Sequence, residues 1–423
     1  MQATVTLPLS GIRVLDLSRI LAGPWCAMVL ADLGAEVIKV EHPKRGDDTR
    51  DWGMRIGSTE TTYFNSVNRN KYSICLDLGT EEGPDIARAL ARQSDVVIQN
   101  FKFGGADRMG LGYDRLSQEN PGLVYCSIAG YGSTGSEARR PGYDLVVQGE
   151  AGLMALNGEA DQPPLKFGIA AVDLFTGQYA AQAVLAALVE RGRTGRGRHV
   201  ELSLFDCGLS LTSYYGLEAL LRGEDPPRYG NAHPSIVPYG VFQTGDGPVV
   251  ITVGNNAQFE RFCRDVIGRP DLAEDPRFTT NIARSTHRAT LVPEIEAELV
   301  KHRRADLLAT LRRYGIPCGE VLGLHEALRS ERAREAGLVE EYSHPAGGKA
   351  PVLASPFQFE GERARVRMPP PRLGEHTEEI LSRCLGLTAE RVAELRIRGV
   401  TRADASRSLP EVGLKSSPPQ WPG

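Results

Sequence analysis

This chain of 423 residues has little excess of charge of either sign, no long apolar run and no metal-binding pattern. Its 49 basic and 53 acidic side chains leave a net charge of -4, which provides no whole-molecule field for nucleic acid or an anionic membrane. Nowhere do about 18 apolar residues follow one another, so the sequence predicts no transmembrane helix. The eight histidines do not fall at metal-ligand spacing. We therefore expect a soluble protein that binds neither nucleic acid nor a membrane and has no metal centre.

Paired cysteines and an export signal are also missing. The seven cysteines are an odd number, and none belongs to a C-x-x-C pair of the kind used for zinc or redox chemistry. Most lie in apolar surroundings, so we expect buried thiols. Residues 1–8 contain neither a basic stretch followed by an apolar run nor a cleavage-like site, and the expected location is the cytoplasm.

The common phosphate and hydrolase motifs are absent, because no Walker loop, H-E-x-x-H or G-x-S-x-G occurs. One G-x-G-x-x-G pattern does occur, at residues 130–135, with the spacing of a dinucleotide-binding loop. Such a loop needs a helix to begin at its third glycine, whereas the following segment 136–142 contains Pro141 and is a poor helix. We therefore favour a ligand-facing or structural loop, and expect the chemistry to come from carboxylates, amides and glycines.

The first half of the chain contains a regular alternation of short apolar runs with helix-like stretches. This pattern is typical of βαβ units around a parallel sheet. It predicts an α/β fold with a Rossmann-like, doubly wound parallel sheet. The expected strands are residues 12–17, 36–40, 73–78, 95–100, 123–128 and 199–204, and the expected helices are residues 23–33, 81–92 and 173–191.

The texture of the sequence changes at Asp225, where two prolines interrupt the chain. Two strand patterns follow, at 239–244 and 248–253, and then charged amphipathic helices. A stretch rich in proline and arginine, 351–371, reads as an extended connector. We predict a large domain in residues 1–224, a small α+β domain in 225–330, a connector and C-terminal part returning to the large domain in 331–410, and a disordered tail in 411–423.

Asp173 is a lone charge among apolar and small residues at the expected start of a helix. Aspartate is a favoured N-cap, and the local sequence alone favours this capping role. The functional alternative is a partly buried carboxylate that the helix N-terminus keeps ionised and available as a nucleophile. Both roles can hold for one residue.

Two further groups of residues are candidates for ligand binding. The loop Gly254, Asn255 and Asn256 follows an expected strand and is either an ordinary turn or a lid that shields a reactive acyl group from water. Basic side chains gather in loops after expected strands, where ligands of open α/β sheets bind. These anion-binding candidates are Arg19, His42, Lys44, Arg45, Arg50, Lys71 and Arg108.

Several ordered segments resemble class III CoA-transferases, the group that includes formyl-CoA, crotonobetainyl-CoA and succinyl-CoA-dependent dicarboxylate transferases. The resemblance runs from Leu9 to about Leu387 and is carried by many separate stretches. They are residues 13–17, 22–24, 33–41, 46–50, 68–71, 108–113, 142–144, 168–177, 194–197 and 374–377.

The resemblance implies that Asp173 is the catalytic aspartate and that CoA is a substrate, with no permanently bound cofactor. It implies that Gly254, Asn255 and Asn256 lie over the acyl group, with Tyr143 nearby, and that two subunits form an interlocked homodimer. The residues that it places along CoA are Arg19, Ile20, Leu21, Ala22, His42, Lys71, Arg108 and Met109. Because an aspartate with a pKa of ~3.9 is ionised at neutral pH, it can attack a thioester without a base.

The expected substrates are succinyl-CoA as donor and a dicarboxylic acid such as glutarate as acceptor. Oxalate-specific relatives have glutamine where Leu21 stands and consecutive glycines in place of the 254–256 loop, so oxalate is disfavoured. The segment 228–239 resembles the glutarate group instead. A second carboxylate would need an arginine, and Arg50 is the first candidate, although a surface role fits it equally well.

Two alternatives stay open. An α-methylacyl-CoA racemase shares the fold but uses a histidine base where Tyr143 stands, and tyrosine, with a pKa near ~10, is a poor base at neutral pH. A catalytically silent CoA-binding subunit of a heteromeric transferase is the other, and the presence of Asp173 counts against it.

Overall fold

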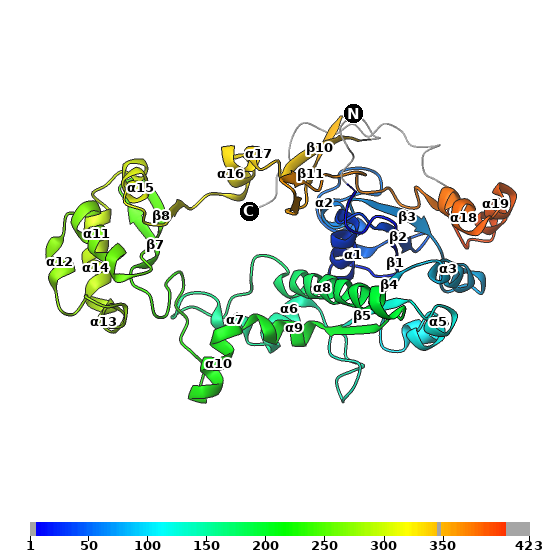
Figure 1. The fold of residues 1–423 in the computed structure, drawn as a ribbon, viewed down its shortest axis with the longest axis horizontal. Coiled ribbons are helices and arrows are strands. Elements are labelled where there is room, and N and C mark those ends of the chain that lie inside the picture. Colours follow the sequence, from blue (N-terminus) through cyan, green and yellow to red (C-terminus); the bar gives the residue numbers. More distant parts are fainter. Residues whose placement is uncertain (1–5, 345–347, 403–423) are drawn as a thin grey trace. The chain divides into compact units, whose positions relative to one another are not determined.

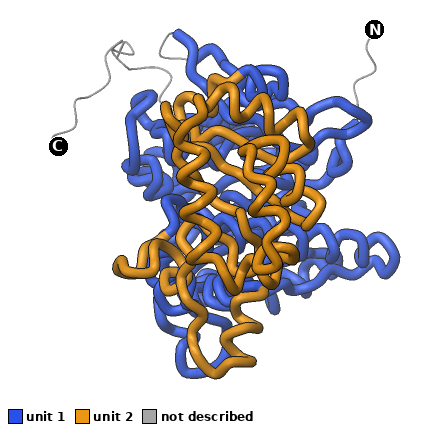
Figure 2. The backbone as a smooth tube through the Cα atoms, turned by 90° about the vertical axis from the view of Figure 1, so that its left-hand side faces the viewer, with its two compact units in different colours: residues 1–153, 167–213, 331–423 blue, residues 154–166, 214–330 orange. Residues whose placement is uncertain are grey.

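The structure, a computed structural model, describes residues 6–344 and 348–402. The predicted disordered tail, 411–423, lies outside these residues. The chain forms two compact units (Figure 2). Unit 1 comprises residues 1–153, 167–213 and 331–423, and unit 2 comprises residues 154–166 and 214–330.

Unit 1 is built on a six-stranded sheet in which every neighbouring pair is parallel. The strand order β3-β2-β1-β4-β5-β6 confirms the predicted α/β class and doubly wound parallel sheet (Figure 1). All six predicted strands are present. They are β1 (Arg13–Asp16), β2 (Glu36–Glu41), β3 (Lys71–Cys75), β4 (Val96–Gln99), β5 (Val124–Ala129) and β6 (His199–Ser203). The order reverses between β1 and β4, and ligands of such sheets bind beyond the carboxyl ends of the strands at this point.

Helices cover both faces of the sheet, because the strands are apolar on both sides. One core joins β1, β4 and β5 to α1 (Ala22–Asp32) and α8 (Ala171–Thr194), and the other packs α3 (Glu82–Arg92) and α5 (Tyr113–Glu119) on the opposite face. The remaining elements of unit 1 are η1 (Asp48–Asp51), α2 (Thr62–Ser66), α4 (Gly105–Arg108), α6 (Asp144–Glu150), α9 (Leu204–Leu211), α17 (Glu331–Glu335), β10 (Val339–Ser343), β11 (Lys349–Leu353), β12 (Gln358–Phe359), β13 (Glu362–Arg363), α18 (Thr377–Leu385) and α19 (Ala389–Ile397).

Helix α8 is long and apolar enough, by length and composition, to cross a membrane. In this structure one side of it packs into the core of unit 1, with Val172, Ala180 and Val184 fully buried. At Gly177 it approaches α1 so closely that an added Cβ atom would lie 2.5 Å from the Ala22 carbonyl oxygen. The glycine therefore lets α8 pack at short range against the start of α1.

Unit 2 is a small α+β body. Its antiparallel sheet contains β7 (Tyr239–Thr244), β8 (Gly247–Thr252) and β9 (Cys318–Glu320), so both predicted strand patterns are strands. An apolar core of valine, isoleucine, leucine and phenylalanine joins this sheet to α11 (Asn256–Arg261), η2 (Phe262–Val266), α12 (Pro270–Glu274), α14 (Arg288–Leu299) and α15 (Arg304–Arg313). Unit 2 also contains α13 (Asn281–Thr286) and α16 (Leu324–Arg329). The short α7 (Leu153–Leu156) and α10 (Ser213–Arg222) lie where the chain passes from one unit to the other.

Candidate active site

Asp173 lies in the first turn of α8, which begins at Ala171. The capping role predicted for it is wrong, because a different carboxylate caps this helix. Oδ1 of Asp144, the first residue of α6, accepts the backbone N–H of Val172 at 2.8 Å and that of Asp173 at 3.3 Å. Its Oδ2 accepts the Gln148 amide at 2.6 Å, and Gln148 is buried. The Asp173 side chain is therefore not needed to cap its own helix.

Two effects raise the pKa of Asp173 from 3.8 to about 7. Partial burial of the carboxyl group is the larger, and the negative charge of Asp144 is the second. The expectation of a carboxylate with an ordinary pKa is therefore wrong. A higher pKa makes the ionised carboxylate a stronger nucleophile, while less of it is ionised at neutral pH.

Asp173 is on the wall of a cavity of about 300 Å³ at the carboxyl edge of the sheet. The other walls come from the loops after β1, β4 and β5, which meet where the strand order reverses. The cavity brings six predicted site residues together, namely Arg19, Ile20, Leu21, Ala22, Tyr143 and Asp173. Its remaining lining includes residues 100–103, 128–130 and 138–142, together with Leu204.

The predicted ligand-facing loop supplies part of this wall. Gly130 lines the cavity, and a Cβ atom added to it would lie 2.5 Å from the backbone nitrogen of Gly142. Only glycine fits so close to another backbone, so packing explains this glycine and no dinucleotide-binding role is needed. The chain then leads through Tyr143 to the start of α6, so the loop also carries Asp144 to α8.

Lys71 and Arg50 are placed in the interior instead of on the cavity wall. The Lys71 ammonium is fully buried and donates to Asp16 at 3.0 Å, to the Pro24 carbonyl at 2.8 Å and to Asn68 at 3.0 Å. Burial lowers the pKa of Lys71 to about 8.

Arg50 donates twice to the buried carboxylate of Glu41, at 2.7 Å each, and lies over the Phe64 ring. Its guanidinium is thus already paired with an internal carboxylate. The ligand roles expected of Lys71 and Arg50 have no geometric support in this structure.

His42, Arg108 and Met109 do not line the cavity either, although they follow β2 and β4 at the same edge of the sheet. His42 is partly exposed, with Nε2 3.8 Å from the Asp77 carboxylate. Arg108 ends α4 and is exposed, and Met109 follows it. Contacts between these three residues and CoA stay predictions.

The loop of Gly254, Asn255 and Asn256 belongs to unit 2 and is held by side chains of its own unit. Asn255 caps α11 by accepting the Gln258 N–H at 2.9 Å, and the Gln258 side chain accepts the Gly254 N–H at 2.8 Å. Asn256 accepts from the buried Arg284 at 3.1 Å. A role over the acyl group stays a prediction.

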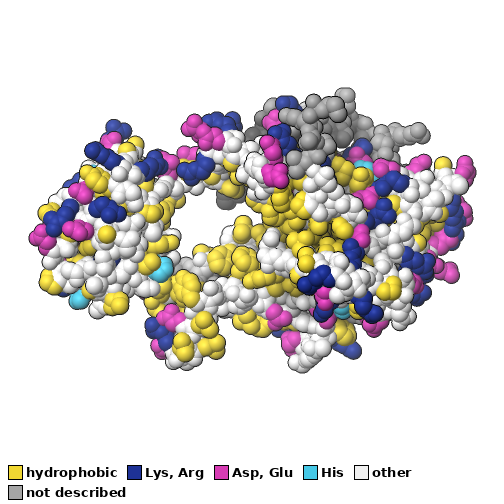
Figure 3. Space-filling model, in the orientation of Figure 1, with side chains coloured by type: hydrophobic (Ala, Val, Ile, Leu, Met, Phe, Trp, Pro, Cys, Tyr) yellow, Lys and Arg dark blue, Asp and Glu magenta, His cyan; other side chains and the backbone are white. Residues whose placement is uncertain are grey.

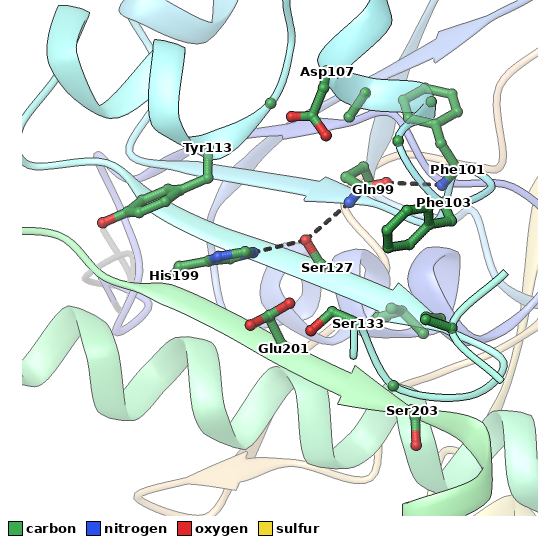
Figure 4. Close-up of a pocket in the computed structure, with 18 of the residues that line it drawn as sticks. Gln99, Phe101, Phe103, Asp107, Tyr113, Ser127, Ser133, His199, Glu201 and Ser203 are labelled. Carbon is green, nitrogen blue, oxygen red and sulfur yellow. Dashed lines mark hydrogen bonds between the residues drawn. The ribbon is translucent and has the colours of Figure 1, made fainter. Parts of the chain in front are cut away.

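A second cavity, of about 520 Å³, lies on the β5 and β6 side of the sheet (Figure 4). Its polar centre is a chain in which Gln99 donates to Ser127 at 2.9 Å and Ser127 pairs with His199 at 2.9 Å. Tyr113 stacks on His199. Four carboxylates line this cavity but only one lysine, which disfavours an anion as large as CoA; they are Asp107, Asp114, Glu201 and Asp206, with Lys102. The cavity at Asp173 is therefore the better candidate active site.

Known proteins resemble this chain over most of its length. Residues 9–377 match the model described as CoA-transferase family III. The chain is 40% identical over 381 residues to the succinate–glutarate CoA-transferase of Agrobacterium fabrum, covering 89% of this chain and 95% of that protein. It is also 40% identical over 321 residues to the acetyl-CoA:oxalate CoA-transferase of Acetobacter aceti, covering 76% and 82%.

A solved structure extends the similarity to the fold. The crystal structure of a CAIB/BAIF family protein from Brucella suis has a TM-score of 0.79 and 41% sequence identity, and the match covers 90% of this chain and all of that one. Enzymes of the matched family use CoA thioesters as substrates, as the resemblance implied. Nearly the whole described chain takes part in these matches. The chain belongs to CoA-transferase family III and is a CoA-transferase.

Proposed function

We propose that this enzyme moves CoA from succinyl-CoA to a dicarboxylic acid such as glutarate, with Asp173 as the nucleophile. The observation that carries the proposal is the single carboxylate of Asp173 on the wall of a cavity at the carboxyl edge of the sheet. Percentage identity alone does not choose the acceptor, because a glutarate and an oxalate enzyme are each 40% identical to this chain, over 381 and 321 residues. Leu21, on the cavity wall, supports glutarate over oxalate, since the oxalate-specific pattern has glutamine there.

The reaction begins when the Asp173 carboxylate attacks the thioester carbonyl carbon. The C–S bond breaks and leaves a succinyl-aspartyl anhydride and CoA thiolate. The thiolate attacks the carbonyl carbon of Asp173, which releases succinate and forms an aspartyl-CoA thioester. The acceptor carboxylate then attacks this thioester, which releases CoA thiolate and forms a new anhydride between the acceptor and Asp173. Attack of the thiolate on the acceptor carbonyl carbon gives the product and frees Asp173. An anhydride hydrolyses readily, so an enclosed site is an advantage.

The structure also limits which cation meets the distal carboxylate of the acids. Arg50 is occupied by Glu41, and the cavity-lining Arg140 is paired with both Glu137 and Glu150. Among the described cations that line the cavity, Arg139 and Lys102 have no carboxylate within ion-pair distance, but only Arg139 has the planar guanidinium that binds a carboxylate through two hydrogen bonds. The Arg139 guanidinium lies 5.6 Å from the centre of the Phe103 ring. We propose Arg139 for this contact in place of Arg50.

An interlocked homodimer in the cytoplasm is part of the proposal. On α10, Leu217, Leu220 and Leu221 are 64%, 82% and 88% exposed. On α8, Phe175 and Val189 are also exposed, and apolar side chains are visible on the surface (Figure 3). Apolar surface of this kind is typical of a face that another chain covers, and a second copy is the simplest cover. Light scattering that gives the mass of a monomer at micromolar concentration would contradict this part.

The function is tested by following CoA transfer from succinyl-CoA to a panel of dicarboxylic acids. The purified chain alone should transfer CoA to glutarate, and Asp173→Asn, which keeps the shape of the side chain, should not. Activity only with a second polypeptide would favour a silent subunit. Exchange of the α-proton of a branched acyl-CoA without any transfer would favour a racemase.

A further inference from the structure

The loop between β1 and α1 holds one residue in a costly conformation. Ile20 has φ of +72°, in the left-handed region. A β-branched side chain seldom occupies this region, because its Cβ atom crowds the backbone. Such a conformation persists only where the surroundings hold it, and it is found at functional sites. Ile20 lies on the wall of the Asp173 cavity, between Arg19 and Leu21, which line it too.

Two side chains hold the peptide group between Arg19 and Ile20 from its two ends. The Asn100 amide donates to the Arg19 carbonyl oxygen at 2.7 Å, and the Ile20 N–H donates to the Asp47 carboxylate at 3.2 Å. Asp47 is fixed by a buried ion pair with Lys39, 2.9 Å apart, and Lys39 also donates to the Ser18 carbonyl at 2.9 Å. The orientation of this peptide plane is therefore set by hydrogen bonds and not by the preference of isoleucine.

Asn100 makes a second hydrogen bond to the backbone of Arg19. Its Oδ1 accepts the Arg19 N–H at 2.9 Å while its Nδ2 donates to the Arg19 carbonyl, so the amide pairs with both backbone polar groups of one residue. Asn100 follows β4, the strand next to β1 where the strand order reverses. Of the side chains of this length, only an amide both donates and accepts; aspartate can only accept and alanine can do neither.

We infer that Asn100 is a positioning residue, which holds Ile20 in its left-handed conformation and thereby sets Arg19 and Leu21 against the acyl-CoA beside Asp173. The inference rests on the proposed function. Without the two Asn100 bonds, the Ile20 backbone relaxes to negative φ, and the wall formed by Arg19 and Leu21 moves. Small misplacements at a reacting centre are costly, up to about 100-fold in rate.

The test is a double-mutant cycle between Asn100→Ala and Ile20→Gly. Asn100→Ala should lower kcat about tenfold or more while the melting temperature stays close to that of the wild type. Glycine adopts positive φ without a penalty, so adding Ile20→Gly should restore at least about fivefold of the loss relative to Asn100→Ala alone. Adding Ile20→Val, which keeps the β-branch, should restore nothing. If Asn100→Ala does not fold, Asn100→Asp, which can still accept from Arg19, replaces it in the same cycle.

The outcomes separate the inference from the function that it rests on. Wild-type transfer with an unaffected Asn100→Ala, or a loss that glycine and valine at position 20 restore equally, overturns the inference alone. If the wild type binds CoA but transfers it to no acid, the proposed function fails. The same cycle is then read by titration of CoA itself, where loss of affinity in Asn100→Ala and recovery with Ile20→Gly support the inference and equal affinities overturn it.

Discussion

The carboxylate of Asp144 accepts the backbone N–H of Asp173 at 3.3 Å, so the residue that caps α8 also brings a like charge to the carboxylate that we propose as the nucleophile. The cap stabilises the helix on which Asp173 stands. The charge of Asp144 adds to burial in raising the pKa of Asp173 to about 7. One side chain therefore holds the helix turn that carries Asp173 and raises the basicity of its carboxylate.

The first prediction is the pH dependence of the wild-type enzyme. In the proposed mechanism only ionised Asp173 attacks the thioester, so kcat/KM for succinyl-CoA should rise with pH and level off above an inflection at about 7. Initial rates at subsaturating succinyl-CoA, measured from about pH 5 to about pH 9, give the profile. A profile that is flat over this range, as an ordinary aspartate pKa of ~3.9 would give, would contradict the raised pKa.

A second prediction separates the charge of Asp144 from its cap. Asp144→Asn keeps an oxygen that can accept from Val172 and Asp173 but removes the negative charge, so the inflection should move to lower pH. Asp144→Ala removes both, and should in addition destabilise the protein by about 1 kcal/mol through loss of the cap. An unchanged inflection in Asp144→Asn would mean that Asp144 does not act on the pKa of Asp173.

The raised pKa of Asp173 should also make the stability of the protein depend on pH. A carboxyl group whose pKa is raised in the folded state stabilises it fully below the unfolded pKa and loses this contribution as pH rises through the folded value. For Asp173 the window runs from about 3.8 to about 7. The free energy of unfolding of the wild type, relative to Asp173→Asn, should fall across this window by on the order of 2 kcal/mol, since the side chain is partly exposed. Urea titrations at several pH values measure it, and a flat difference would contradict it.

Lys71 provides a test of structural against ligand-binding roles. Lys71→Ala leaves Asp16 buried without its ion-pair partner and should destabilise the protein by about 3–5 kcal/mol. Lys349→Ala, which removes an exposed ion pair with Glu341, should cost at most about 1 kcal/mol. If the Lys71→Ala protein has normal stability but binds CoA far more weakly, the result would support the contact with CoA that the sequence resemblance implied.

Arg139 should set the affinity for the acceptor. Arg139→Ala should raise the KM for glutarate about tenfold or more, as expected for loss of a charge-assisted bond to its distal carboxylate, with less effect on a monocarboxylic acid. Arg50→Ala should instead lower stability, because Glu41 would lose its buried partner. The kinetics of both variants with glutarate and with a monocarboxylic acid of similar length check this, and an equal loss with both acids would argue against Arg139.

The sheet could be predicted from the sequence because its strands are short apolar runs between polar loops, a local pattern. The site could be predicted only in part. Asp173 stands at a helix start, but the residue that caps it, Asp144, is far away in the sequence and meets it only after folding. The position of Lys71 also depends on a distant partner. A basic residue at the start of a strand is expected to be exposed, and only the fold shows that Lys71 is paired with Asp16 on another strand.

Trapping of the covalent intermediate tests most directly whether Asp173 is the nucleophile. The enzyme is incubated with succinyl-CoA without acceptor, treated with hydroxylamine or borohydride, digested and analysed by mass spectrometry. The modification should map to Asp173, appear in the wild type and be missing in Asp173→Asn. Modification of another residue under turnover conditions, or a wild-type rate of CoA transfer in Asp173→Asn, would contradict the mechanism.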